Sequence, residues 1–314
     1  MSQNRVIVIG GATASGKSQL AIDLALALNG VVVNADASQV YKGIPIISAA
    51  PDATDLAKAK HRLYGYLDNN VNGNVVDWLH RAVTEIRDIW RQGKLPIVVG
   101  GSGLYIDALV NGSTPIPEVS AEIRRQVMKL QEDGGVDAVY AKLRQADSAA
   151  AAMLNPKDTT RVRRAYEIFL QTGVSIAEWY KRPMLKQLPE ADFFVIKILP
   201  DKETLYRRCD LRFAQMVANG ALAEIRGLLA EKLSEQLPVM RAQGVPELMS
   251  FVLGNISLAD AVAMAELHTR QYAKRQITWF KNKLTADVAL NEIYDGGRLP
   301  ELLSAFKSKF GENK

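Results

Sequence analysis

Short apolar runs and helical patterns alternate along the chain. Four runs predict buried strands, because each is short and is bounded by turn-forming or polar residues; they are residues 6–9, 31–33, 97–99 and 193–198. Residues 19–28 and 77–92 carry apolar side chains at helical spacing, and we predict that Asp77 caps the second of these helices. Strands that alternate with helices predict an α/β fold, with a parallel sheet covered by helices on both faces.

The alternation breaks between the third and fourth expected strands. Residues 111–120 read as a loop with two prolines, and from residue 121 to about 180 only helical patterns occur. An all-helical stretch between two strands of one sheet predicts an inserted subdomain. We therefore expect a helical insertion over residues 113–190, within a catalytic core formed by residues 1–112 and 191–314.

The composition is that of an ordinary globular protein. The chain has 314 residues, of which 48% are hydrophobic, so it can bury a sizeable core. Its one cysteine, Cys209, excludes an intrachain disulfide and a cysteine-based zinc site, and it suits the reducing cytoplasm, where we expect the protein. No apolar run approaches a membrane span, and the N-terminus does not read as a signal peptide. The net charge of +5 indicates either an anionic partner or a solvated surface with spare lysines.

A phosphate-binding pattern follows the first expected strand. Residues 11–18 fit G-x-x-x-x-G-K-[ST] between a strand and a helix, which predicts a P-loop NTPase-like sheet rather than a chance glycine turn. Lys17 can reach an outer phosphate, and the Ser18 hydroxyl can ligate Mg²⁺, the one cofactor that we expect. The pattern predicts a diphosphate or triphosphate ligand and does not identify ATP. The expected phosphate-binding residues are Gly11, Ala12, Thr13, Ala14, Ser15, Gly16, Lys17 and Ser18.

Two further strand ends carry candidate chemistry. Asp36 follows the second expected strand, where a carboxylate faces the ligand crevice of a parallel sheet. It is either a proton acceptor for a second substrate or a residue that only caps a turn. Residues 100–103, Gly-Gly-Ser-Gly, follow the third strand and either permit close backbone approach or form an ordinary turn. Polar side chains that suit a planar ligand such as a nucleobase stand near Asp36, namely Ser38, Gln39 and Tyr41.

Two basic clusters lie in helical patterns. The first, in the insertion, contains Arg161, Arg163 and Arg164. The second covers residues 270–283, with five basic residues and no acid, interleaved with three aromatic side chains. Each is either a solvated helix face or a surface that contacts phosphates and stacks on bases, as single-stranded RNA requires.

These segments together resemble the tRNA dimethylallyltransferase family, also called tRNA isopentenyltransferases. Residues 11–18 look like the family's G-P-T-A-S-G-K-[ST], and residues 34–43 contain a relative of D-S-x-Q-x-Y-x-G. Residues 95–109 are similar to P-x-x-V-G-G-T-G-L-Y, and residues 155–173 to N-x-x-D-x-x-R-x-x-R-A-L-E. Residues 269–281 match T-R-x-x-A-K-R-Q-x-T-W-F almost throughout, a motif that simple P-loop kinases lack.

The chain departs from the family pattern at four places. Ala12 stands for a common proline, Ala37 for a serine and Ser102 for a threonine. Residues 242–247, Ala-Gln-Gly-Val-Pro-Glu, replace I-G-Y-[KR]-[EQ] of many members. Alanine at position 37 lacks the serine hydroxyl and therefore one polar contact to the base or backbone, whereas Ser102 keeps a hydroxyl. The change at residues 242–247 affects an expected tRNA contact.

The resemblance implies transfer of a dimethylallyl group from dimethylallyl diphosphate to the exocyclic amine of the adenosine just 3′ of the anticodon. It implies binding of the tRNA anticodon stem-loop, with the insertion as a clamp. We expect the chain to act as a monomer and to bind no membrane. The implied catalytic residues are Lys17, Ser18, Asp36 and Ser102. The implied tRNA-binding residues are Asp36, Ala37, Ser38, Gln39, Ser102, Thr160, Arg161, Val162, Arg163, Arg164, Arg241, Gly244, Lys274, Arg275, Gln276, Ile277, Thr278, Trp279, Phe280 and Lys281.

Two other functions share part of this pattern. A small-molecule kinase of the shikimate or nucleotide kind has the loop, an acid after the second strand and a later glycine turn, but usually fewer residues and no basic helix near its end. An RNA-binding regulator with a decayed loop leaves the intact Lys17, Ser18 and Asp36 unexplained.

Overall fold

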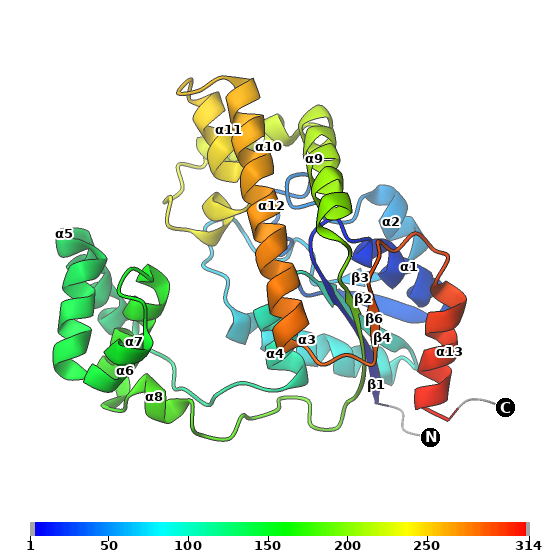
Figure 1. Ribbon diagram of the computed structural model, residues 1–314, viewed down its shortest axis with the longest axis horizontal. Coiled ribbons are helices and arrows are strands. Elements are labelled where there is room, and N and C mark those ends of the chain that lie inside the picture. The colour runs from blue at the N-terminus through cyan, green and yellow to red at the C-terminus, as the bar shows by residue number, and fades with distance from the viewer. Residues whose placement is uncertain (1–3, 312–314) are drawn as a thin grey trace. The chain divides into compact units, whose positions relative to one another are not determined.

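The computed structural model describes residues 4–311 (Figure 1). They form two compact units: one joins the chain up to Val110 with the chain from Gln187 onward, and the other is Asn111–Lys186. The sequence placed the insertion at residues 113–190. Within the described part of the chain, every helix is too short or too polar to cross a membrane.

A six-stranded parallel sheet forms the centre of the first unit. Its strand order is β3-β2-β4-β1-β5-β6, which agrees with the P-loop NTPase-like α/β sheet predicted from the sequence. The strands are β1 (Arg5–Gly11), β2 (Gly30–Asn34), β3 (His61–Arg62), β4 (Leu95–Gly100), β5 (Asp192–Ile198) and β6 (Val288–Leu290). The sequence analysis missed β3 and β6, because two or three residues are too few to show an apolar run.

Alternate residues of the strands pack on opposite faces of the sheet. On one face, Val6 and Val8 of β1 share a buried cluster with helices α3 (Val75–Arg91), α4 (Gly103–Val110) and α12 (Leu258–Lys283). On the other face, Ile7 and Ile9 pack with α1 (Lys17–Leu28) and α13 (Leu299–Lys309). Figure 1 shows these two helices on one side of the sheet. Because both faces are covered, residues 6–9 are fully buried, which explains the continuous apolar run in the sequence.

The start of α3 differs from the prediction. Asn74, not Asp77, is the capping residue, since its side-chain oxygen accepts the backbone N–H groups of Val76 at 2.9 Å and Asp77 at 3.0 Å. Asp77 lies in the first turn instead, where its negative charge favours the positive end of the helix dipole. The pattern misled because the helix begins two residues before the aspartate, at Val75.

Helices dominate the chain after β5. The helix α9 (Lys202–Ala218) packs along α12 (Figure 1). In the sequence, three helices separate these two: α10 (Ala221–Ala230), the 3₁₀ helix η1 (Pro238–Arg241) and α11 (Val245–Val252). The basic cluster of residues 270–283 lies in α12, as its helical pattern predicts. The remaining short helix of this unit, α2 (Ala53–Lys58), follows β2.

The second unit is helical and has its own buried core. Its helices are α5 (Ala121–Ala146), α6 (Ser148–Met153), α7 (Thr159–Thr172) and α8 (Ile176–Trp179). Apolar residues of α5 and α7, including Val127, Leu143 and Val162, pack together in its centre. The ends of the unit meet, because the backbone N–H and C=O groups of Ser113 and Leu185 exchange hydrogen bonds of 3.1 and 2.9 Å.

Candidate active site

The phosphate-loop pattern folds as the turn between β1 and α1. Its backbone takes left-handed conformations at Ala14 (φ 61°) and Gly16 (φ 90°). A side chain on Gly16 would also lie 2.5 Å from the backbone oxygen of Tyr294, so glycine is required there for two reasons. Tyr294 follows β6, and its N–H donates to the Ser15 carbonyl at 3.2 Å. The loop is therefore supported by a segment that stands far from it in the sequence.

Lys17 is a buried cation at the first turn of α1. Its Nζ donates to the Ala12 carbonyl at 3.2 Å, and the side chain is only 8% exposed. Burial lowers the pKa of Lys17 to about 8; Asp36 opposes this shift and the nearby charge of Arg212 adds to it. An incoming anion would favour the charged ammonium, so the residue is suited to a ligand that brings negative charge.

Ser18 faces a second hollow beside the loop. This hollow is also lined by Asp52 and Asp55, from the start of α2, and by Arg208. Mg²⁺ usually takes one or two protein oxygens and completes its shell with phosphate oxygens and water. The Ser18 hydroxyl with these carboxylates fits that donor set. Among residues 4–311 there is no cluster of three or more His, Cys, Asp or Glu side chains able to hold a metal without a ligand's help.

Asp36 lies on a tightly held turn after β2. The fully buried Asn34 supports the turn, because its Oδ1 accepts the Asp36 N–H at 2.8 Å and its Nδ2 donates to the Asp36 carbonyl at 3.0 Å. Oδ1 of Asp36 accepts both the N–H (3.1 Å) and the hydroxyl (2.7 Å) of Ser38. The side chain also lines a cavity beside the phosphate loop. Asp36 therefore holds a turn and also lines a cavity, so both interpretations of this residue stay open.

The glycine turn after β4 packs directly against the Asp36 turn and α12. A Cβ on Gly100 would lie 2.0 Å from the Ala35 carbonyl oxygen, and one on Gly103 would lie 2.4 Å from the Trp279 ring. Ser102 joins the two turns, because its Oγ accepts the Ala37 N–H at 2.9 Å. These contacts explain the glycines by close packing, and they place Ser102 next to Asp36 in space.

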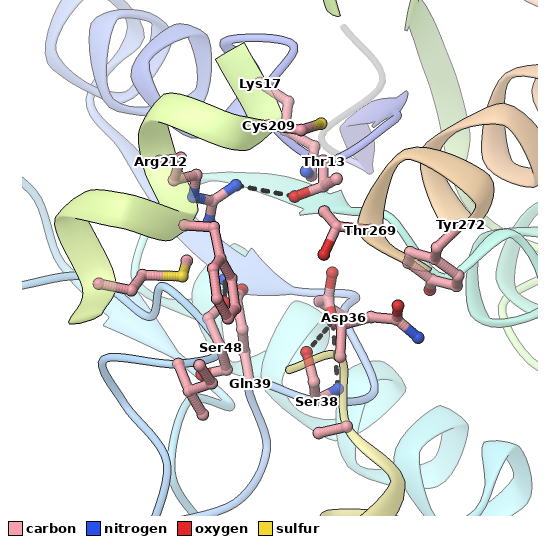
Figure 2. Close-up of a pocket in the computed structure, with 15 residues that line it drawn as sticks. Thr13, Lys17, Asp36, Ser38, Gln39, Ser48, Cys209, Arg212, Thr269 and Tyr272 are labelled. Atoms are coloured by element: carbon pink, nitrogen blue, oxygen red, sulfur yellow. Dashed lines mark hydrogen bonds between the residues drawn. The ribbon is translucent and has the colours of Figure 1, made fainter. Parts of the chain in front are cut away.

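A cavity that opens to solvent connects the loop with Asp36. Figure 2 shows Thr13, Lys17 and Arg212 on one side and Asp36 with Ser38 on the other. Apolar side chains complete the lining, namely Ile47, Phe213 and Met216. One cavity therefore offers a cationic end, an apolar part and a carboxylate.

Helix α9 supplies residues that the sequence analysis missed. Arg212 donates from Nη1 to the Thr13 hydroxyl at 2.9 Å (Figure 2), and Arg208 donates from Nε to the Ala14 carbonyl at 3.0 Å. Burial lowers the pKa of Arg212 below its ordinary value. The same helix carries Cys209, whose pKa burial raises to about 11, so its thiol is neutral. No local motif marks these residues, because only the packing of α9 brings them next to the phosphate loop.

The residues expected at tRNA divide into exposed and buried groups. On α12, Lys274, Arg275, Thr278 and Lys281 are exposed, and the first three line a hollow together with Trp279. Gln276 and Phe280 of the same helix are 5% and 0% exposed, so neither presents a surface to RNA. Phe280 instead packs on Gly10, where a Cβ would lie 2.6 Å from its ring.

The other expected tRNA contacts are divided in the same way. In the second unit, Thr160 and Arg161 are exposed, whereas Val162 is fully buried in the core and unavailable to RNA. Arg163 and Arg164 are half-buried and pair with Glu167 at 3.5 and 3.8 Å. In the first unit, Arg241 is exposed, Ile277 is half-buried, and Gly244 is buried with a φ of 87°.

Known proteins resemble the chain over nearly its whole length. The family described as IPP transferase matches residues 39–283. The tRNA dimethylallyltransferase of Granulibacter bethesdensis is 41% identical over 90% of this chain and 88% of its own, and one from Rhodopseudomonas palustris strain BisB5 is 43% identical over 88% and 86%. Among solved structures, the tRNA isopentenylpyrophosphate transferase of Bacillus halodurans has a TM-score of 0.71 at 29% identity, covering 98% of this chain and 97% of its own. A eukaryotic dimethylallyltransferase acting on tRNA has a TM-score of 0.84 at 30% identity, covering 99% and 80%.

Proposed function

Because the chain belongs to the IPP transferase family of tRNA dimethylallyltransferases, we propose that it transfers a dimethylallyl group from dimethylallyl diphosphate to tRNA. The acceptor is the exocyclic amine of the adenosine just 3′ of the anticodon. The observation that carries this proposal is the single cavity lined by both Lys17 of the phosphate loop and Asp36. The family relationship gives no support to the small-molecule kinase alternative.

The cavity suits a substitution at an allylic carbon. The carbon–oxygen bond of the donor breaks, the diphosphate leaves with its electron pair, and a carbon–nitrogen bond forms to the adenine amine. Lys17 and Arg212 at the cationic end stabilise the charge that develops on the diphosphate. Ser18, with Asp52 and Asp55 near it, would hold Mg²⁺, which neutralises diphosphate charge when bound.

Asp36 is the proton acceptor for the adenine amine. That amine is a poor nucleophile because its lone pair is delocalised into the ring, so removal of its proton assists the attack. The hydrogen bonds from Ser38 hold one carboxylate oxygen in place, and Ser102 braces the next residue of the turn. The adenosine must leave its stack to enter the cavity, which is easiest for a nucleotide in a loop.

The exposed basic residues of α7 and α12 bind the anticodon stem-loop. The Arg161→Ala and Lys274→Ala variants should weaken tRNA binding, because each removes a phosphate contact. The slope of log affinity against log salt should fall by roughly one for each variant. Fluorescence anisotropy over a salt series measures this slope, with Lys307→Ala on α13 as the control for loss of an exposed lysine. Unchanged slopes in both variants would show that these helix faces are solvated surfaces that do not contact the RNA.

Binding of the donor should weaken as the pH rises through about 8. Lys17 has a pKa of about 8 in the free protein, below its ordinary value of 10.5, so it loses its charge as the pH increases. A bound diphosphate favours the charged form of Lys17. Above about pH 8, Lys17 must therefore take up a proton when the donor binds. Affinity should fall by up to about tenfold per pH unit. Calorimetric titration of dimethylallyl diphosphate between pH 7 and pH 9.5 measures this, and the Lys17→Met variant should remove the dependence.

Mass analysis of tRNA nucleosides tests the proposal in the cell. A strain that lacks its own tRNA dimethylallyltransferase should regain dimethylallyl adenosine when it expresses this chain. We propose that the chain acts as a monomer and that it works in the cytoplasm, where tRNA is used. A complemented strain whose adenosine stays unmodified would refute the assigned reaction.

A further inference from the structure

Gln276 forms a bridge between the two halves of the active site. Its Oε1 accepts the Thr13 N–H of the phosphate loop at 2.9 Å, and its Nε2 donates to the Gly101 carbonyl of the glycine turn at 2.9 Å. The two partners lie 263 and 175 residues away in the sequence. One amide side chain on α12 thus hydrogen-bonds two loops that are far apart in the sequence, one through its oxygen and one through its nitrogen.

The two loops that Gln276 holds serve different substrates in the proposed reaction. Thr13 is part of the diphosphate loop and is also held by Arg212 through its hydroxyl. Gly101 lies next to Asp36, where the proposed acceptor adenine binds: a Cβ on Gly101 would lie 3.1 Å from Oδ2 of Asp36. The next residue, Ser102, holds the Asp36 turn through the N–H of Ala37. The bridge therefore fixes the phosphate loop relative to the carboxylate that takes the proton.

The position of Gln276 excludes a simple role at the RNA surface. The side chain is 5% exposed, and both ends of its amide are already hydrogen-bonded inside the protein. Its neighbours Lys274, Arg275 and Thr278 are exposed on the same helix. A buried amide with both groups satisfied fixes geometry, whereas an RNA contact needs an exposed or unpaired group.

We infer that Gln276 is a positioning residue that aligns the diphosphate loop with Asp36, so that the allylic carbon meets the adenine amine. This inference rests on the proposed function, because alignment matters only when two substrates react in one cavity. Small displacements of reacting groups lower the rate of such a step strongly. Loss of the bridge should therefore slow the transfer step while tRNA still binds to the outer face of α12.

Two substitutions of Gln276 separate the two hydrogen bonds. Gln276→Leu removes both and leaves the Thr13 N–H and the Gly101 carbonyl without their partner. It should lower kcat at saturating tRNA by about 10- to 100-fold, while the Kd for tRNA changes less than about twofold. Gln276→Glu has nearly the same shape and keeps an acceptor for Thr13 but has no amide proton for Gly101. Its KM for dimethylallyl diphosphate should stay near that of the wild type while kcat falls. Gln92→Leu, at an exposed amide after α3, is the matched control.

A double-mutant cycle provides a second test, because it compares two substitutions that disrupt the same bridge from opposite sides. Gly101→Ala would place a Cβ 2.3 Å from Nε2 of Gln276, so it should displace the bridge and reduce kcat. In the presence of Gln276→Leu, the added loss from Gly101→Ala should be much smaller, because the bridge is already absent. Additive losses would overturn the inference.

The remaining outcomes are distinguishable by their readouts. A tenfold weaker tRNA Kd with unchanged kcat in Gln276→Leu would make the residue a tRNA contact and refute the positioning role. A fall in kcat explained by a smaller folded fraction in thermal melts would refute it as well. Failure of the wild-type chain to prenylate tRNA would instead contradict the proposed function itself.

Discussion

Replacing Asp36 by asparagine should lower kcat at least ~10²-fold while the Kd for tRNA stays near that of the wild type. The reason is that Asp36 takes a proton from the adenine amine, and a general base typically contributes ~10²–10⁴-fold. The amide of asparagine keeps an oxygen that can accept the two hydrogen bonds from Ser38, so the turn should persist. Single-turnover kinetics with saturating tRNA and dimethylallyl diphosphate measure the transfer step directly.

A second variant separates the chemistry of Asp36 from the shape of its turn. Ser38→Ala removes the hydroxyl donor at 2.7 Å but leaves the carboxylate and the backbone N–H donor. Its loss of activity should be much smaller than that of Asp36→Asn. If Asp36→Asn keeps turnover within a few-fold of the wild type, Asp36 only caps the turn and the proposed proton transfer is wrong.

Replacing Lys17 by methionine should lower prenyl transfer by at least about 10²–10³-fold, the usual effect of removing one group that stabilises developing charge. Lys17 is about nine-tenths buried and lines the cavity at the loop, where the diphosphate charge grows. Measurement of kcat and KM for dimethylallyl diphosphate distinguishes lost binding from lost stabilisation of the leaving group.

The stability of the Lys17→Met variant provides the control for that loss. Burial lowers the pKa of Lys17, which means that the fold disfavours its charge. An unbranched apolar side chain of similar length relieves this cost, so the melting temperature should be equal to or above that of the wild type. A variant that is well folded and fully active would show that the loop does not stabilise the diphosphate.

The main sheet and the phosphate loop could be predicted because local signals define them. The apolar run of residues 6–9, the glycines and Lys17-Ser18 are adjacent in the sequence, and a parallel sheet needs strands buried on both faces. Asp36 could be placed at the carboxyl end of its strand for the same reason. Short β6 gave no such signal, yet the segment after it carries Tyr294, whose backbone supports Ser15.

The rest of the cavity depends on contacts between distant segments. Arg212 reaches Thr13 from 199 residues away, and its own neighbourhood in α9 is an ordinary amphipathic helix. The family resemblance implied that Gln276 contacts tRNA, because the residue stands in the basic motif of residues 269–281. The sequence could not show that its side chain points inward to Gly101, since this follows from the packing of α12 on β1 and α4.

The most direct test is to supply purified protein, Mg²⁺ and unmodified tRNA with either dimethylallyl diphosphate or ATP in separate reactions. The phosphate loop fits both ligands, so only the products distinguish prenyl transfer from phosphate transfer. We predict prenylated adenosine and released diphosphate in the first reaction only, and neither product with Lys17→Met. Transfer of phosphate from ATP to a small acceptor, without prenylated adenosine in the first reaction, would contradict the assignment of this cavity to dimethylallyl transfer.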